Sequence, residues 1–389
     1  MRVAIIATEK LPVPPVRGGA IQIFVDAVAQ RLVKGNDISV CSVSDPALMS
    51  GGDDSPGVHY RYFGSTDYLS ELTNHVAEAG YDIIHVCNRP AWVEPLAAAA
   101  PGSRFVLSVH NEMFAAGKIS EGMGRRCIDR VARITTVSDY IGKTIVSRFP
   151  AARAKVRTLY SGVDLAAYHP PWTTRGQSLR EEFRGDLDLT GKKVILSIGR
   201  LSKVKGAHLL LQALPTVLEE HPDAVLVFVG SKWFGDNTVN NYVKHLYQLA
   251  AVFKDSVLFT GFVPPDNIQG LFAMADVFVC SSQWQEPLAR VHFEAMAAGL
   301  PIITTNRGGN PEVVHTGENG VVIDRYDDPA EFARHINVLL DSANDRERLG
   351  RKGRELAEAR FGWQQVAARL ERVYAETRAL EQNHREGDQ

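Results

Sequence analysis

Short apolar segments alternate with amphipathic ones along nearly the whole chain, and this alternation constrains the fold more than any other feature. Strands that are apolar throughout are typical of parallel sheets covered by helices on both faces. In the first half the expected strands are 3–7, 38–43, 58–63, 83–87, 105–109, 134–137 and 156–159. In the second half they are 194–198, 225–229, 257–260, 277–280, 302–305 and 321–323. The sequence therefore predicts an α/β protein with two Rossmann-like domains and a cleft between them.

The length of 389 residues also suits two domains of ordinary size better than one. A stretch rich in proline and then in polar residues makes 171–190 the best candidate for a linker. It would separate an N-terminal domain at 1–170 from a C-terminal domain at 191–362. The segment 363–389 is expected to be mostly helical, with a frayed tail.

Composition excludes several classes of protein. A formal net charge of −2 gives no reason to expect a nucleic-acid partner. The apolar run at 3–7 is too short for a signal-peptide core, and no segment is long enough to span a bilayer. The four cysteines have no metal-type spacing; they are Cys41, Cys87, Cys127 and Cys280. We therefore expect a soluble, cytoplasmic protein.

Two glutamates, Glu286 and Glu294, are separated by seven residues across an expected loop-to-helix junction. Glu286 would lie in the loop and Glu294 about one turn inside the helix. Between them, the backbone amides of Leu288, Ala289 and Arg290 would be unpaired and would offer a phosphate the positive end of the helix dipole. One carboxylate could then bind sugar hydroxyls and the other ribose hydroxyls. Two solvated helix charges are the alternative interpretation of this pair.

Ligands of open parallel sheets bind beyond the carboxyl ends of the strands. Arg200 comes just after the expected strand 194–198, and Lys205 precedes the next helix, so both could face a nucleotide diphosphate. They would stabilise the negative charge that develops on the departing oxygen. Gly230 and Ser231 end the following strand, where a small residue lets a ligand approach the sheet. Surface cations and a simple turn are the alternatives.

Taken together and in this order, the segments resemble the retaining glycosyltransferases of family four, over nearly the whole length of the chain. The segments that carry the resemblance are Gly18-Gly19, His110, Gly199-Arg200-Leu201, Lys203, Lys205-Gly206, Phe228-Val229-Gly230, Gly261-Phe262-Val263 and the two glutamates. The resemblance implies the GT-B architecture, in which two Rossmann-like domains face a cleft and the C-terminal helix crosses back to the first domain. The residues at 230–235 look most like the spore-coat-associated branch of the family.

The resemblance also implies roles that the pattern leaves open. Phe262 and Val263 would hold the nucleobase through backbone groups, and His110 would hydrogen-bond the donor sugar. The loop at Gly18 and Gly19 would lie by the donor phosphates and the acceptor. A structural histidine and a plain turn are the alternatives.

Three residues depart from the family pattern. Ala289 and Arg290 stand where relatives have a glycine and an apolar residue. Arg290 would add a third cation near the donor, which puts the usual sugar preference in doubt. Ser161 stands where relatives commonly have asparagine, so no asparagine contact is carried over.

The sequence thus predicts a retaining glycosyltransferase that uses a nucleoside diphosphate sugar, preferably a UDP-sugar, and an unidentified acceptor. The resemblance implies front-face attack, which needs no protein nucleophile. No Asp-x-Asp motif falls near the expected cleft, so Arg200, Lys205 and the helix dipole are expected to replace a metal, and no cofactor is expected.

Three alternatives remain open. One is a sugar-nucleotide epimerase or hydrolase of the same architecture, and another is a non-catalytic coat-associated binding protein. The third concerns a basic helical region, which is either a solvated face or a surface for an anionic acceptor, a membrane or the cell envelope. Its residues are Lys118, Arg125, Arg126, Arg130 and Arg133.

Overall fold

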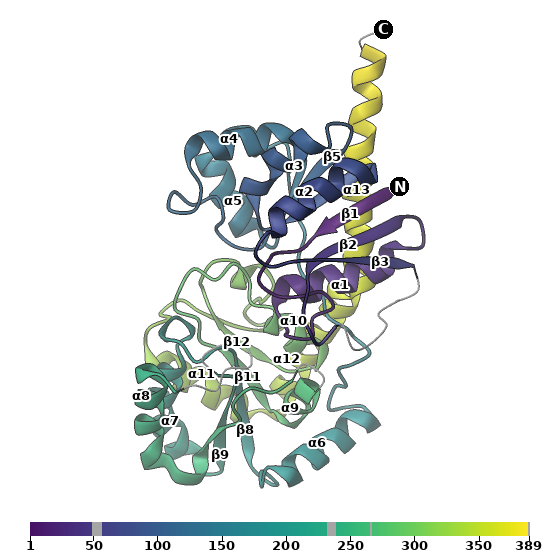
Figure 1. Cartoon of the computed structure of the whole chain (residues 1–389). Coiled ribbons are helices and arrows are strands. Elements are labelled where there is room, and N and C mark those ends of the chain that lie inside the picture. The colour runs from purple at the N-terminus through teal and green to yellow at the C-terminus, as the bar shows by residue number, and fades with distance from the viewer. Residues whose placement is uncertain (49–56, 232–238, 265–266, 388–389) are drawn as a thin grey trace. The chain divides into compact units, whose positions relative to one another are not determined.

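The computed structural model describes residues 1–48, 57–231, 239–264 and 267–387 (Figure 1). It divides into two compact units, and each is a parallel sheet with helices packed around it. The first unit is Met1–Gly162 with Trp363–Gln389, and the second is Val163–Gly362. The predicted α/β class is confirmed.

The first sheet has the strand order β3-β2-β1-β4-β5-β6-β7. Its strands are β1 (Arg2–Ile6), β2 (Asp37–Val43), β3 (Val58–Phe63), β4 (Ile83–Cys87), β5 (Arg104–Val109), β6 (Val131–Thr136) and β7 (Val156–Thr158). The α-helices of this unit are α1 (Ala20–Leu32), α2 (Tyr68–Ala79), α3 (Val93–Ala99), α4 (Glu121–Arg130), α5 (Asp139–Arg148) and α13 (Trp363–Gly387). The strand order reverses between β1 and β4.

The second sheet has the order β10-β9-β8-β11-β12-β13. Its strands are β8 (Lys193–Ile198), β9 (Ala224–Val229), β10 (Val257–Phe259), β11 (Val277–Cys280), β12 (Ile302–Thr305) and β13 (Gly320–Ile323). The α-helices are α6 (Thr174–Asp186), α7 (Ala207–Glu220), α8 (Asn241–Ala250), α9 (Ile268–Met274), α10 (Val291–Ala297), α11 (Pro329–Asp341) and α12 (Ala343–Leu356). Here the order reverses between β8 and β11. Ligands of such sheets bind beyond the carboxyl ends of the strands at this point, so the ligand site is expected there.

All the expected strands form, and most of their ends agree with the prediction to within one residue. The apolar runs are buried as predicted; in β4, for example, every residue is buried. The largest difference is β6, which begins three residues before the expected 134. Half-buried Ala132 and charged Arg133 interrupt the apolar pattern after buried Val131, so the sequence alone does not show the start of this strand.

The expected linker at 171–190 is wrong, because it contains α6, a helix of the second unit. Arg180 donates hydrogen bonds to the terminal carbonyls of α9, including that of Ala275 at 2.6 Å. Arg180 and Arg184 also pair with Asp276 at 2.5 and 2.8 Å. The helix docks through these ion pairs, so its sequence has the polar composition of a linker.

The boundary before the second unit also differs from the expected residue 170. The first unit ends at Gly162, and Val163 already pairs with Gly362. Arg354 donates to the carbonyl oxygen of Tyr168 at 3.0 Å, which binds this stretch to the second unit. Domain membership here depends on contacts with residues almost 200 positions away.

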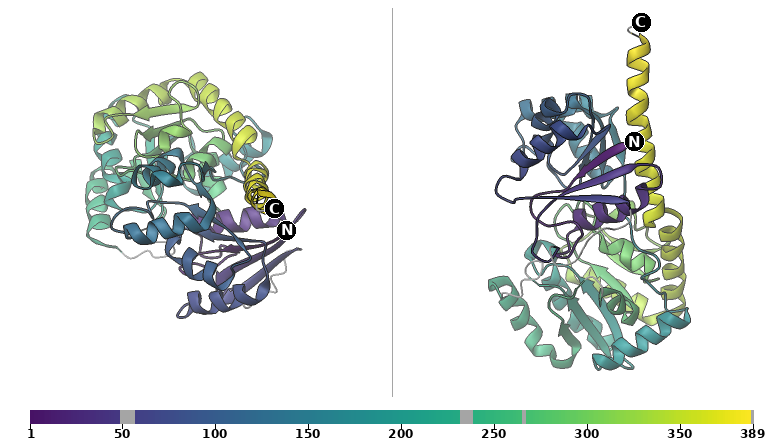
Figure 2. Two further views of the ribbon diagram at one scale, coloured as in Figure 1. Left: turned by 90° about the horizontal axis from the view of Figure 1, so that it is seen from above. Right: turned by 45° about the vertical axis from the view of Figure 1, so that its right-hand side comes forward.

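Helix α13 completes the core of the first unit (Figure 2). Trp363, Val366, Leu370 and Tyr374 belong to the same buried cluster as Phe24 of α1. In the right-hand view of Figure 2 the helix runs along the first unit, and its last turns project beyond the sheet.

Candidate active site

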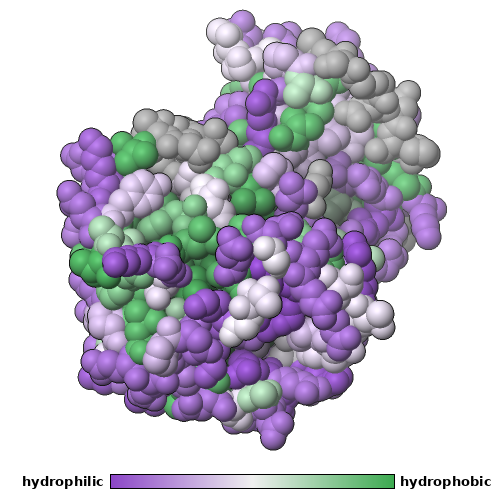
Figure 3. All heavy atoms as spheres, turned by 90° about the horizontal axis from the view of Figure 1, so that it is seen from below, coloured by the Kyte–Doolittle hydropathy of each residue, from purple (hydrophilic) through white to green (hydrophobic). Residues whose placement is uncertain are grey.

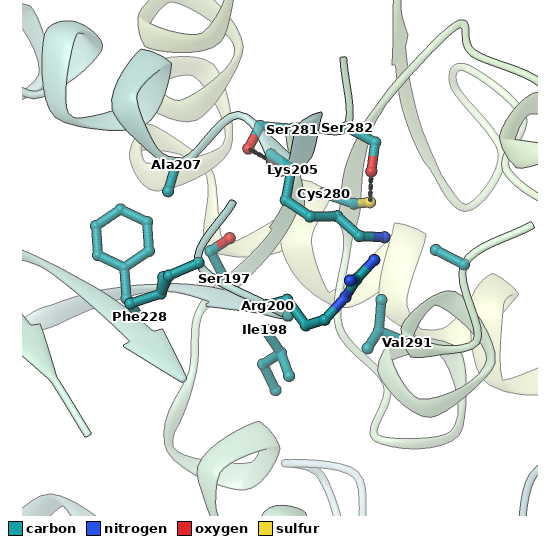
Figure 4. Close-up of a pocket in the computed structure, with 13 residues that line it drawn as sticks. Ser197, Ile198, Arg200, Lys205, Ala207, Phe228, Cys280, Ser281, Ser282 and Val291 are labelled. Carbon is teal, nitrogen blue, oxygen red and sulfur yellow. Dashed lines mark hydrogen bonds between the residues drawn. The ribbon is translucent and has the colours of Figure 1, made fainter. Parts of the chain in front are cut away.

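A pocket lies at the switch point of the second sheet, beyond the carboxyl ends of β8 and β11 (Figure 4). Its lining includes Arg200, Lys205, Cys280, Ser281, Ser282, Ala289 and Val291. Figure 4 shows the side chains of Arg200 and Lys205 reaching into the same space. Two of the predicted phosphate-binding cations are therefore brought together.

Hydrogen bonds join the loop that carries Lys205 to the loop after β11. Ser281 Oγ donates to the Lys205 carbonyl oxygen at 2.9 Å, and the Gln283 N–H donates to that of Val204 at 2.8 Å. Gly206 has a φ of 76°, and a Cβ there would lie 2.0 Å from the Ser281 carbonyl oxygen. Only glycine fits such a close approach.

Glu286 is 6% exposed and lies in the loop before α10, as predicted. Its Oε2 accepts hydrogen bonds from Lys205 Nζ at 2.5 Å and from Ser282 Oγ and Trp284 Nε1, both at 2.8 Å. Burial raises the pKa of Glu286, but the charge of Lys205 and these bonds outweigh burial and lower it below its ordinary value. Glu286 is therefore a stable anion.

The predicted set of unpaired amides needs a correction at Ala289. Its N–H donates to Asn310 Oδ1 at 3.3 Å, so this amide is not open to a phosphate as expected. Helix α10 begins only at Val291, after Arg290 as its N-cap, and Leu288 lies buried in the preceding loop. The sequence analysis did not identify Asn310 as a partner of the Ala289 amide, or Ser282 and Trp284 as partners of Glu286.

Glu294 lies inside α10, as predicted, and is 7% exposed. Its carboxylate pairs with Arg290, one helical turn earlier. Burial first, and then the charge of Glu294, raise the pKa of Tyr168 well above its ordinary value, so its hydroxyl stays protonated beside this carboxylate. Arg290 thus matches the charge of Glu294 and does not stand as a separate third cation.

Close packing against the neighbouring strand requires a glycine at position 230. Gly230 has a φ of 130°, and a Cβ there would lie 2.1 Å from the carbonyl oxygen of Gly199. Ser231 is buried, and its carbonyl oxygen accepts from the Leu201 N–H at 2.9 Å. Phe262 and Val263 lie half-buried in the loop after β10. Of these four predicted residues, none lines the pocket described above.

Three predicted residues belong to the first unit, at the carboxyl edge of its sheet. Gly18 and Gly19 precede α1 with φ of 73° and 103°, values that glycine adopts more readily than other residues. His110 follows β5, and its ring packs edge-on against Phe24 at 5.2 Å between centroids. Burial lowers the pKa of His110 to about 4, so its ring is neutral.

One ring nitrogen of His110 has no hydrogen-bond partner among the described residues. Its Nε2 is buried without a hydrogen bond to any residue that the structure describes. Its backbone N–H donates to Asn88 Oδ1 at 3.0 Å. A buried unpaired nitrogen is costly, and a ligand could satisfy it.

A cluster of Glu220, His221 and Asp341 in the described part of the second unit brings together potential metal ligands. However, Lys193 Nζ lies 2.8 Å from His221 Nδ1 and, as an ammonium, must donate to it. Its Nε2 lies 3.4 Å from Asp341 Oδ1 and makes no hydrogen bond with any described residue. Because Lys193 already occupies the other ring nitrogen, this cluster is a poor candidate for a metal site.

The basic region of the first unit is largely paired within the protein. Its ion pairs are Arg125 with Glu121, Arg126 with Glu94 and Arg133 with Glu376. These contacts favour the interpretation as a solvated face. Figure 3 views the molecule from below and shows a mostly hydrophilic face with some apolar areas. No helix among the described residues could cross a membrane.

The comparisons with known proteins agree with this geometry. The model of glycosyl transferases group 1 matches residues 180–356, and that of glycosyltransferase family 4 matches 21–167. The chain is 58% identical to spore coat protein SA of Bacillus subtilis, over 97% of this chain and 100% of that protein. The chain belongs to glycosyltransferase family 4. This confirms the predicted family and the resemblance to its spore-coat branch.

Two further proteins resemble this chain, one in sequence and one in fold. YtcC of Bacillus subtilis, which is named as a glycosyltransferase, is 46% identical over 96% of this chain and 92% of its own. A crystal structure of Anabaena HepE in complex with UDP-glucose is 21% identical, with a TM-score of 0.76 over 96% of this chain and 99% of that chain. The second likeness confirms the fold of two Rossmann-like units.

Proposed function

We propose that this glycosyltransferase transfers a sugar from a UDP-sugar to an acceptor with retention of configuration and without a metal. The observation that carries the proposal is the pocket in which Arg200 and Lys205 meet at the switch point, with Lys205 paired to buried, ionised Glu286. The choice of UDP is supported by HepE, whose crystal structure holds UDP-glucose.

Arg200 and Lys205 would bind the diphosphate oxygens. As the bond between the anomeric carbon and the phosphate oxygen breaks, negative charge accumulates on that oxygen, and two nearby cations stabilise it. The acceptor oxygen bonds to the anomeric carbon on the face that the diphosphate leaves. Its proton passes to the departing phosphate oxygen, so the step balances without a protein base or a metal.

The two glutamates would divide the rest of the donor. The three protein hydrogen bonds to Glu286 end on Oε2, and Oε1 would accept a sugar hydroxyl. Glu294 would accept the ribose hydroxyls, with Arg290 orienting its carboxylate. His110 would hydrogen-bond the donor sugar through its unpaired ring nitrogen.

A thermal-shift panel tests the donor. UDP, GDP and ADP, each free and with glucose attached, are added to the protein; a ligand at about 100 times its Kd stabilises by roughly 2.7 kcal/mol. We expect the largest shifts with the UDP compounds. A larger shift with a GDP or ADP compound would contradict the proposed nucleotide, and no shift with any would favour the coat-associated binding protein.

Product analysis separates transfer from the other enzymatic alternative. Incubation with UDP-glucose alone should give at most slow hydrolysis; fast isomerisation or hydrolysis would indicate the epimerase or hydrolase. Activity should survive EDTA. Loss of activity in EDTA and its recovery with magnesium or manganese would show that the metal-independent step is wrong.

A further inference from the structure

Asn88 follows β4 at the carboxyl edge of the first sheet and has an unusual backbone conformation. Its φ is 56°, in the left-handed region that few residues other than glycine adopt, although asparagine tolerates it better than most. Asn88 is only 3% exposed. A strained conformation at a buried position persists only where its surroundings require it.

The surroundings show what the conformation achieves. The Asn88 N–H donates to the Ser108 carbonyl oxygen at 2.7 Å and extends the pairing of β4 with β5. The left-handed turn then directs the backbone away from β5, while Asn88 Oδ1 accepts from the His110 N–H at 3.0 Å. The side chain thus supplies the hydrogen bond that the departing backbone cannot, and it supports β5 up to His110.

The turn itself is held from its other side. Arg89 Nη1 donates to the Asn88 carbonyl oxygen at 2.9 Å. The same guanidinium binds both carboxylate oxygens of Glu9, after β1, at 2.7 and 2.8 Å. Asn88 is therefore a rigid support for the histidine backbone.

We propose that Asn88 is a positioning residue for His110: its side chain holds the histidine backbone so that the ring, packed on Phe24, presents Nε2 to the donor sugar. The inference rests on the proposed role of His110. Displacements of about 1 Å at such a group cost large factors in rate.

The test compares Asn88→Gly with Asn88→Asp. Glycine adopts the left-handed turn without strain but removes the acceptor, whereas aspartate keeps an acceptor oxygen. We expect Asn88→Gly to lower the affinity for UDP-glucose about tenfold, which corresponds to about 1.4 kcal/mol. Its affinity for UDP should not change, and Asn88→Asp should restore most of the preference for UDP-glucose over UDP.

His110→Ala tests the underlying role separately. If His110→Ala leaves the affinity for UDP-glucose unchanged, the proposed role of His110 is wrong and the inference about Asn88 is overturned with it. If His110→Ala weakens binding but Asn88→Gly does not, the inference about Asn88 alone is wrong. In the double variant, Asn88→Gly should add nothing to the loss caused by His110→Ala; an additive loss would also overturn the inference.

A readout independent of the donor is the titration of the His110 ring by nuclear magnetic resonance. With Asn88→Gly the loosened ring should gain solvent, and its pKa should rise from about 4 toward the ordinary value. His85, the neighbouring histidine, has a pKa of about 3 and should not interfere. Asp188→Gly is the control, because it also replaces a residue with positive φ by glycine, but at an exposed position. It should change neither the affinity for UDP-glucose nor the pKa of His110.

Discussion

Glu286 and Glu294 belong to one motif but have different partners, and the difference bears on what each contributes. Glu286 is bound by Lys205, Ser282 and Trp284, residues of the pocket and of the loop beside it. Glu294 is bound by Arg290, the N-cap residue of its own helix. The first carboxylate is thus coupled to the phosphate-binding cation, and the second is not.

We predict that Glu294→Gln weakens UDP binding, whereas Glu286→Gln mainly slows turnover. An amide keeps the shape but loses the charge, and a hydrogen bond to a charged group contributes about 1.5–3 kcal/mol, or roughly 10- to 150-fold. Calorimetry with UDP and the initial rate of UDP-glucose turnover measure the two effects. Exposed Glu318→Gln is the control. The opposite division of effects between the two variants would show that the assignments are reversed.

Helix α6 is held on the second unit by charge, which makes its docking sensitive to acid. Burial raises the pKa of Asp276, but the charges of Arg180 and Arg184 and the N–H of Val194 outweigh burial and lower it below its ordinary value. A carboxyl with a lowered pKa stabilises the fold fully above its unfolded pKa of about 3.9, and this contribution is lost as the pH falls through the lower folded value.

We therefore predict that Asp276→Asn lowers the free energy of unfolding at pH 7 by about 3 kcal/mol, since it leaves two partly buried arginines without their anion. The variant should also lose less stability than the natural protein between pH 5 and pH 3. Urea titrations at several pH values measure both effects. An unchanged acid dependence in the variant would contradict the role of Asp276.

A buried polar chain joins helix α13 to the first sheet. Tyr374 Oη bonds His85 Nδ1 at 2.7 Å, His85 Nε2 bonds Ser108 Oγ at 2.6 Å, and Ser108 bonds Thr135 at 2.6 Å. Burial, with a smaller effect of His110, lowers the pKa of His85 to about 3, so its ring is neutral at ordinary pH.

We predict that Tyr374→Phe destabilises the first unit by about 1–3 kcal/mol, because it leaves a buried histidine nitrogen without a partner. Chemical denaturation monitors the loss. Exposed Tyr247→Phe in the second unit is the matched control and should change little. Equal stability of Tyr374→Phe and the natural protein would show that the chain contributes nothing measurable.

The two units are interleaved in sequence, since the second is inserted between the body of the first and its last helix. Val366, Leu370 and Tyr374 are buried in the first core. The residues proposed to bind UDP belong to the second unit. Loss of the last helix should therefore affect the two units differently.

We predict that a chain ending at Gly362 loses the stability of the first unit and keeps that of the second. Removing α13 deletes about four large apolar side chains from the first core, and the burial of each contributes roughly 1.5–3 kcal/mol to stability. Hydrogen exchange read by mass spectrometry should show lost protection in β1 to β7 and retained protection in β8 to β13. Equal loss in both sets would contradict this division.

Local sequence patterns were enough to predict the strands, the α/β class and the location of the two glutamates. These features depend on local apolar patterns and on residue types at loop-to-helix junctions, which are read within a few residues. Arg200 and Lys205 were also predicted this way, because Arg200 follows an expected strand and Lys205 precedes the next helix. The role of His110 came from the resemblance to the family.

The partners of the polar side chains could be identified only in the folded protein. Asn310 accepts from the Ala289 amide, Asn88 supports His110, and α6 docks through Asp276. These contacts join residues between 21 and 96 positions apart and depend on the direction of each side chain. A polar residue has the same local pattern whether it faces water or a buried partner. Only the folded chain brings the partner within hydrogen-bonding distance, and so only the fold distinguishes the two.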